Sequence, residues 1–580
     1  MSKLNVDQKS VQEMFSDKKA DFLIPDYQRP YAWSEDECRT LWEDLFAFIF
    51  PDNDKDKFND DEYFLGPIVT FKNDNNQSEI IDGQQRITTL LLLLRAFYDK
   101  FENIKDNHSV DMKKDIERCI WKMNGPYEIN KDNPKIDSEV ATDDDKGEFL
   151  LILKTGETSK EQKSKYAVNF RYFQDKISEF LNDYPGYFLD MPYRIMNNCI
   201  LLPIEAESQD TALRIFSTLN DRGLPLSDAD IFKAQFYKVY SSKDEKDKFI
   251  SQWRDLEAQC RDMFETQNGS PMDELFTRYM YFERASMGNK NTTTEALRKF
   301  YEKDNYKLLK KEGVFDNIIE LAAFWNDVEK QEDNKFSKNV LRKLFVLNYA
   351  PNGMWTYFTS VYFMQNKDEN GFLDQERFEK FLGKTIGFIW TYAITNPGVN
   401  ALRGPVYNEM ISIVNDNPIT FDNYKFDKDQ VKRAFDHFAF NNGRPITKSM
   451  LAWWAFMNPN QELLDIEIKF DIEHIFPKNR QNKGEENALS NPKNLESLGN
   501  KSFLEKKINI RASDYRFEDK KKYYNGYVNR HNQKKEGTKI AELINLAKGN
   551  DDFVENDIIE RKDNIINAFI NYLEANELLE

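Results

Sequence analysis

The sequence predicts a protein of mixed α+β class with several domains. Its 580 residues exceed what one hydrophobic core usually holds, so more than one folding unit is expected. Strand-like runs alternate with helical patterns near the N-terminus, a long middle stretch has mainly helical periodicity, and the strand-like run LLDIEIKF opens the last part. We therefore expect an α+β domain over 1–240, a helical middle region over 241–455 and a further domain over 456–580.

Local patterns predict the first elements. Ser34 and Glu37 have the spacing of a helix capping box, and apolar residues recur at helical spacing after them. Two strands, YFLGPIVTF and SEII, then flank the polar turn KNDNNQ. The second strand leads through Asp82 and Gly83, a tight turn, into the helix QQRITTLLLLLRAF.

A polar, charged stretch over about 100–165 follows, and ordered elements are expected again after it. A strand, CILLPIEA, and a helix, DTALRIFSTL, precede the loop NDRGLPLSD. Ser227 or Asp228 is expected to cap the next helix.

Composition excludes several classes of protein. Hydrophobic residues make up 40% and aromatic residues 14% of the chain, which argues against global disorder. The longest apolar run is only the five leucines 90–94, and the first residues lack the apolar core of a signal peptide, so we expect a soluble cytoplasmic protein without membrane contact. The four cysteines form no CxxC pair and are expected to be reduced core residues.

The charge is distributed unevenly. The whole chain has a net charge of -18, which excludes a protein that coats nucleic acid through a uniformly basic surface. Residues 471–550 nevertheless contain 17 Lys and Arg against 11 Asp and Glu, a net charge of +6. Any contact with nucleic acid is therefore expected in this segment.

The segment DIEHIFPKNR carries the strongest local pattern. Glu473 and His474 stand side by side at a predicted strand end, where a carboxylate can hold a divalent cation while the imidazole deprotonates a water. Asn500 and Asn509 follow in GNKSFLEKKIN, and an amide oxygen is a suitable ligand for Mg²⁺ or Mn²⁺. From spacing alone, a partly exposed histidine and two turn asparagines explain the pattern equally well.

A second pattern lies near the N-terminus, in IPDYQRPYAW and IIDGQQRITTL. The turn after Asp82 aims free backbone N–H groups of the next helix at whatever lies above it, which suits a phosphate. Gln84, Gln85 and Arg86 lie in the first helical turn, and Arg29 and Arg86 can each form paired hydrogen bonds to a phosphate. The alternative is an ordinary helix start with solvated arginines.

The C-terminal motifs EHIFP, GNKSFLEKKIN and RASDYRFEDKKKYY resemble the HNH nuclease domain, of the ββα-metal class, of GmrSD-type modification-dependent (type IV) restriction enzymes. The resemblance implies that Glu473 is the acidic metal ligand and His474 the general base. It further implies that Asn500 steadies the histidine and that Asn509 is the second metal ligand.

Two positions depart from that family pattern. Glu473 stands where the family more often has aspartate, and Lys501 replaces the usual leucine after Asn500. Because the longer carboxylate changes the metal geometry, Asp471, two residues back on the same strand face, is an alternative ligand.

The N-terminal motifs, together with FSTLNDRGLPLSDADIFKAQ at 216–235, resemble the ParB/sulfiredoxin-like domain of the same family. Members bind and hydrolyse nucleoside triphosphates. With Gly83 of the turn and Gln85 of the first helical turn added, the expected nucleotide-binding residues are Gln28, Arg29, Asp82, Gly83, Gln84, Gln85, Arg86 and Thr88.

The resemblance implies an NTP-regulated, metal-dependent endonuclease that restricts modified foreign DNA in antiviral defence. Its cofactors would be Mg²⁺ or Mn²⁺ and a nucleoside triphosphate, its partners DNA and, as a candidate, a second copy of the chain. Phosphate contacts are expected from Lys506, Lys507, Lys520, Lys521 and Lys522.

Two other functions stay open from the sequence: an NTP-switched DNA-binding regulator with a non-cleaving HNH remnant, and an RNA-cleaving toxin. Intact Glu473, His474, Asn500 and Asn509 argue against a decayed site. The aromatic pairs Trp453-Trp454 and Tyr523-Tyr524 are candidates for stacking on bases, with core packing as the alternative.

Overall fold

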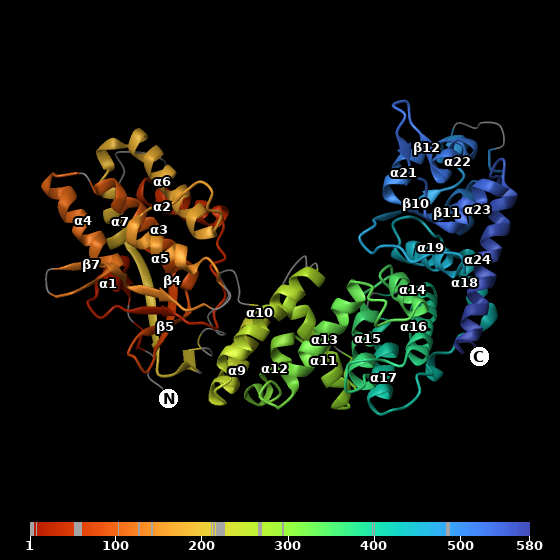
Figure 1. Ribbon diagram of the computed structural model, residues 1–580, viewed down its shortest axis with the longest axis horizontal. Helices are drawn as coiled ribbons and strands as arrows, with labels where there is room; N and C mark the ends of the chain where they lie inside the picture. The colour runs from red at the N-terminus through yellow and green to blue at the C-terminus, as the bar shows by residue number, and fades with distance from the viewer. Residues whose placement is uncertain are drawn as a thin grey trace. The chain divides into compact units, whose positions relative to one another are not determined.

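The structure is a computed structural model of mixed α+β class. It describes residues 5–580 except 7, 52–60, 103, 126–127, 141–142, 210, 213–214, 216–226, 265–269, 293–294, 397, 399–400 and 483–487. The chain divides into two compact units, Met1–Asp255 and Leu256–Glu580 (Figure 1). The helices of the predicted middle region and the predicted last domain lie mainly in the second unit.

A seven-stranded mixed sheet is the framework of the N-terminal unit. Its strands are β1 (Asn5–Val6), β2 (Lys9–Ser10), β3 (Phe22–Ile24), β4 (Tyr63–Lys72), β5 (Ser78–Asp82), β8 (Ile136–Ser138) and β9 (Cys199–Ala206). The strand order is β1-β9-β4-β5-β3-β8, and β2 also pairs with β9. β4 and β5 form an antiparallel hairpin, whereas β3 lies parallel to β5, which brings the segments after these two strands to the same sheet edge.

Helices cover this sheet and form the main core of the unit. They are α1 (Val11–Ser16), α2 (Glu35–Ile49), α3 (Gln84–Phe101), α4 (Asn107–Ile120), α5 (Lys146–Thr155), α6 (Lys165–Asp183), α7 (Asp190–Asn197) and α9 (Asp228–Ser242). α3 packs against α4, α5 and α6, and its five leucines are completely buried. The capping box of α2, with Ser34 and Glu37, is confirmed, and Ser227 caps α9.

The structure corrects the expectation for residues 100–165. This stretch contains α4, α5 and β8, and a small antiparallel sheet of β6 (Trp121–Met123) and β7 (Ile129–Pro134). In α4 the buried residues Met112, Ile116 and Ile120 recur every four positions among charged ones. The many charged residues of α4 lower its mean hydropathy, so the sequence indicates a polar stretch although α4 is a regular amphipathic helix.

The described part of residues 270–458 contains helices and no strand, as predicted. Ahead of it, α10 (Lys246–Met263) contains the division between the two units. The helices are α11 (Pro271–Ser286), α12 (Leu297–Tyr306), α13 (Val314–Glu329), α14 (Lys338–Leu347), α15 (Met354–Asn366), α16 (Gln375–Thr395), α17 (Arg403–Val414), α18 (Lys428–His437) and α19 (Pro445–Met457).

The last part of the chain contains two small antiparallel sheets among short helices. Its elements are β10 (Phe470–His474), α20 (Lys478–Asn482), η4 (Pro492–Glu496), η5 (Leu498–Asn500), β11 (Lys501–Glu505), α21 (Lys506–Ala512), α22 (Phe517–Asn525), β12 (Tyr527–Val528), β13 (Lys534–Lys535), α23 (Ala541–Gly549) and α24 (Glu555–Ala575). The expected strand LLDIEIKF is wrong except for Phe470. Its alternating carboxylates lie in a turn, and the strand is instead FDIEH, which contains the motif itself.

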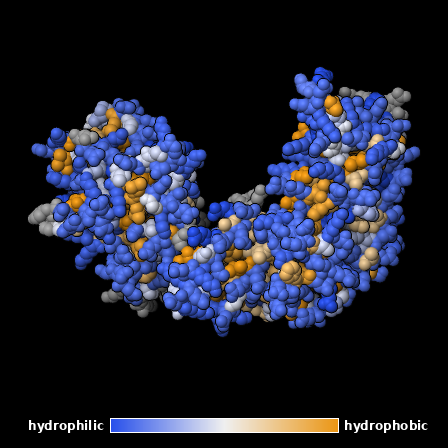
Figure 2. All heavy atoms as spheres, in the orientation of Figure 1, coloured by the Kyte–Doolittle hydropathy of each residue, from blue (hydrophilic) through white to orange (hydrophobic). Residues whose placement is uncertain are grey.

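Among the described residues, no helix has the length and apolar character needed to cross a membrane. On the face drawn in Figure 2, the surface of each unit is mainly hydrophilic, with small apolar patches. All four cysteines are buried and free, as the sequence predicts.

Candidate functional sites

The strands β10 and β11 place the two motif residues of the C-terminal unit on opposite faces of a hairpin. His474 pairs with Lys501 and Glu473 with Ser502, at the end where β10 stops. Because successive side chains of a strand point to opposite faces, Glu473 and His474 point away from each other. Each side chain therefore has surroundings of its own.

Glu473 points inward, against α22. It is 3% exposed, and its Oε1 accepts hydrogen bonds from Lys520 Nζ at 2.8 Å and from Tyr524 OH at 2.5 Å. Burial raises the pKa of Glu473, while the Lys520 ammonium acts in the opposite direction. Lys520, expected as a DNA contact, is only 1% exposed and also donates to His474 O at 2.5 Å, so it is an internal partner of the motif.

His474 lies on the other face, beside a carboxylate that the sequence analysis missed. Its Nε2 is 3.4 Å from Glu496 Oε1, and the residue is 8% exposed. Burial, together with the charges of Lys478 and Lys501, lowers the pKa of His474 to about 4. The imidazole is therefore neutral at pH 7, which is the state that a general base requires.

Glu496 is held in its ionised form by two lysines. Burial alone would raise its pKa, but the hydrogen bond and charge of Lys501, 2.6 Å away, outweigh it and lower the pKa to about 2. Lys478 adds a contact of 3.2 Å. Lys501 is completely buried and also donates to Phe440 O, so the departure from leucine introduces a buried ammonium group with two partners.

Asn500 fastens the backbone that follows His474. Its Oδ1 accepts from Phe476 N at 2.7 Å, and its Nδ2 donates to Leu495 O at 2.9 Å. Ile475 N donates in turn to Asn500 O at 2.9 Å. Asn500 thus acts on the position of His474 through the main chain.

The expected metal ligands do not converge in this arrangement. Glu473 is occupied by an ammonium group and a hydroxyl, Asp471 is half-buried on the same strand, and Asn509 lies half-buried on α21. Within the described ranges, no three His, Cys, Asp or Glu side chains form a cluster that would hold a metal ion. The residues as placed here do not fit a divalent cation.

In the N-terminal unit, the structure brings the two predicted motifs together. Gln28 donates from Nε2 to Ile81 O at 3.1 Å, and Gln85 accepts at Oε1 from Ala32 N at 2.6 Å and from Trp33 N at 3.2 Å. Gln84 Nε2 donates to Arg29 O at 3.2 Å. The glutamines thus join the segment after β3 to the end of β5 and the start of α3.

The start of α3 keeps the features of a phosphate site. Gly83 has φ +90°, which favours glycine, and no side chain caps the helix. The Oε1 of Gln84 is buried without a hydrogen-bond partner among the described residues. The uncapped N–H groups and the arginines fit an anionic ligand, although Arg86 Nη1 donates to Pro67 O at 2.8 Å and Thr88 is buried.

Asp82 closes the same turn. Its Oδ1 accepts from Gly83 N at 2.7 Å. Burial raises the pKa of Asp82, against the opposing charges of Arg86 and Arg29. Of the third motif, residues 216–226 lie outside the described residues, so the structure places only its end, in α9.

Comparison with protein families matches both regions. Residues 11–237 match the GmrSD restriction endonuclease N-terminal domain, and residues 425–568 match the GmrSD restriction endonuclease C-terminal domain. The chain belongs to the GmrSD restriction endonuclease family. No curated protein matches it.

In this GmrSD family member, the other predicted DNA contacts differ in exposure. Lys506 and Lys507 are exposed at the start of α21. Lys521 donates to Asn550 O at 2.7 Å, and Lys522 is exposed beside two tyrosine rings. Four of the five lysines are therefore at least partly open to solvent.

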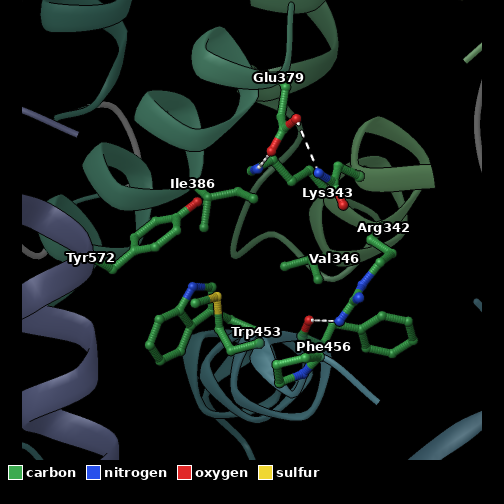
Figure 3. Close-up of a pocket in the computed structure, with 11 residues that line it drawn as sticks. Arg342, Lys343, Val346, Glu379, Ile386, Trp453, Phe456 and Tyr572 are labelled. Atoms are coloured by element: carbon green, nitrogen blue, oxygen red, sulfur yellow. Dashed lines mark hydrogen bonds and ion pairs between the residues drawn. The ribbon is translucent and has the colours of Figure 1, made fainter. Parts of the chain in front are cut away.

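Trp453 lines a cavity of about 230 Å³ in the C-terminal unit of this GmrSD family member (Figure 3). The cavity lies between α14, α16, α19 and α24, where Trp453 and Tyr572 face the ion pair of Lys343 and Glu379, whose atoms are 2.7 Å apart. Trp453 is only 2% exposed, and Trp454 donates to Glu542 at 2.5 Å. Trp453 therefore belongs to the core, the alternative given for it, whereas Trp454 is half-buried.

Proposed function

We propose that the chain is a restriction endonuclease that hydrolyses DNA phosphodiester bonds with His474 as the general base. The observation that carries the proposal is the neutral imidazole at the end of β10, 3.4 Å from the ionised Glu496. In the reaction, His474 takes a proton from a water, the water oxygen bonds to phosphorus, and the bond to the leaving oxygen breaks. The leaving oxygen then takes up a proton from the solvent, and the His474 imidazolium releases its proton to the solvent.

Charged neighbours support this assignment. Lys478 is half-exposed beside Glu496, so its ammonium is close to the reaction and open to a phosphate. Asn500 holds the backbone after His474 and limits the movement of the base. The resemblance also predicts Mg²⁺ or Mn²⁺ as cofactor and an HNH fold. Glu473, the metal ligand that the resemblance implies, pairs with Lys520 in this structure.

We further propose that the N-terminal unit is ParB-like and binds a nucleoside triphosphate at the start of α3. Arg29, Arg86 and the uncapped backbone N–H groups would hold the phosphates, and hydrolysis would regulate cleavage of modified foreign DNA. Gln28 and Gln85 would act by keeping the two motifs together.

One assay tests the proposal. The full chain is incubated with Mg²⁺ or Mn²⁺, with and without NTP, and with unmodified DNA, modified DNA or RNA. Cleavage of modified DNA in preference to the other two supports it. Binding without cleavage would indicate the DNA-binding regulator, and preferred cleavage of RNA would indicate the toxin.

A further inference from the structure

Two tyrosines form a parallel pair near the β10–β11 hairpin. Tyr515 precedes α22 and Tyr523 lies on it; their ring centroids are 5.9 Å apart and their planes differ by 14°. Tyr515 is 48% exposed. The Lys522 ammonium lies 5.0 Å from the Tyr523 centroid and 5.9 Å from the Tyr515 centroid. Tyr515 and Lys522 are therefore open to solvent, and Tyr523 beside them is half-buried.

The pair lies outside the local core. Neighbouring residues on a helix are rotated by about 100° from each other, so Tyr524 points inward to Glu473 while Tyr523 points outward. Phe517 and Tyr524 are completely buried and complete the packing below α22. Tyr523 also packs edge-on against Tyr527, with centroids 5.2 Å apart, so the pair belongs to an aromatic cluster at the surface. Contiguous exposed apolar groups of this kind mark interaction sites.

Two contacts tie the pair to the proposed general base. Lys520, one helical turn before Tyr523, donates to His474 O at 2.5 Å. On the other side, Asp514, next to Tyr515, accepts from Asn479 N at 2.7 Å. Both tyrosines are therefore close to the segment that contains His474.

A cavity of about 410 Å³ opens beside Tyr515, in the volume range of small-ligand sites. Its lining comes from the segment after β10 and from the turn before α22. It includes the carboxylates of Asp514 and Asp519 and the guanidinium groups of Arg480 and Arg516. Carboxylates accept hydrogen bonds from the amino group of a base and arginines donate to base acceptors, so the chemistry of the lining suits the edge of a base.

We propose that Tyr515 and Tyr523 form a stacking platform for an unpaired DNA base, whose edge enters this cavity while Lys522 contacts the adjacent phosphate. The proposal rests on DNA as the substrate of the proposed function. Charge agrees with it, because the platform lies in the segment of net charge +6. A paired base inside a duplex does not present its face, so the ligand is a single-stranded or extruded base.

The test uses binding of a single-stranded DNA oligonucleotide containing 2-aminopurine to the full chain in EDTA, which removes the Mg²⁺ or Mn²⁺ that the family resemblance implies for cleavage. Tyr515→Ala and Tyr523→Ala should each weaken binding about tenfold and reduce quenching of the fluorescent base. Tyr515→Phe and Tyr523→Phe should keep both. Lys522→Gln should lower the salt dependence by about one phosphate contact while quenching persists.

Tyr193→Ala, at a tyrosine 54% exposed in the N-terminal unit, is the matched control and should bind like the parent. Parent-like binding by both platform variants would overturn the proposal, as would equal losses in the Tyr193 control or tighter, platform-dependent binding of RNA. The proposed function fails separately: if the parent quenches the base but cuts no DNA with metal, the platform stands and the nuclease assignment falls.

Discussion

The two predicted sites are assembled in different ways. At the start of α3, the motif glutamines bond main-chain groups of the other motif, so the site is built by residues that the motifs themselves contain. At the β10–β11 hairpin, Glu473 and His474 have charged partners that lie outside the DIEHIFP motif, namely Lys520 and Glu496. The comparison shows two ways to position site residues. The residues that hold a site in place can belong to the motifs themselves, or they can be charged residues distant in the sequence.

The largest expected effect tests the buried charge pair at the hairpin. Lys520→Met should leave Glu473 buried without its cation and lower the free energy of unfolding by about 3–5 kcal/mol. Urea unfolding of the C-terminal transition measures it. The double variant Lys520→Met with Glu473→Gln is the control and should regain most of the loss. A Lys520→Met variant as stable as the parent would mean that the Lys520–Glu473 pair does not stabilise the packing of α22 against β10.

A smaller effect is expected at the start of α3. Gln85→Ala leaves Ala32 N and Trp33 N without their acceptor and should cost about 1–3 kcal/mol of stability. Gln84→Ala removes one hydrogen bond and should cost less stability, yet it should weaken NTP binding because Gln84 Nε2 holds the main chain of Arg29, a proposed phosphate ligand. Unfolding and titration with a fluorescent NTP separate the two. Equal losses of stability in Gln84→Ala and Gln85→Ala would contradict the assignment of different roles to the two glutamines.

The pH dependence of local stability should differ in sign between His474 in one region and Asp82 in the other. His474 has a pKa lowered from 6.5 to about 4, so its contribution is present above pH 6.5 and is lost as pH falls toward 4. Burial raises the pKa of Asp82, so its contribution is present at low pH and is lost as pH rises through and above 3.8. Glu473, on the same strand, has a raised pKa and contributes with the opposite sign to His474. Hydrogen exchange at pH 4.5 and 7, corrected for intrinsic rates, should therefore show that lowering the pH reduces β10 protection more in the parent than in His474→Ala. An equal change in both proteins would contradict the buried neutral imidazole.

The sequence was sufficient where the deciding contacts are local. The capping box of α2, the turn at Gly83 and the helix α3 were predicted because each depends on neighbouring residues. The inward position of Lys520 was not, because its partner Glu473 is 47 residues away and nothing in the spacing links them. Tyr523 and Tyr524 were treated as one pair, whereas the helix turns one outward and the other inward.

Glu496 was missed for the same physical reason. It lies in η4, outside the EHIFP motif, and no periodicity marks it as a partner of His474. From the sequence, Lys501 is only a position where the chain differs from the family pattern. The structure shows its contact: the register of β10 and β11 places Lys501 opposite His474, and its ammonium bonds Glu496.

The central claim is that His474 is the base in phosphodiester hydrolysis, and its replacement tests this most directly. Cleavage of DNA by His474→Ala should fall by about 10²- to 10⁴-fold, while stability changes by only about 1 kcal/mol and binding of the oligonucleotide is retained. His437→Ala, at an exposed histidine of α18, is the matched control and should cleave at the parent rate. A stably folded His474→Ala protein that cuts DNA as fast as the parent would contradict the account.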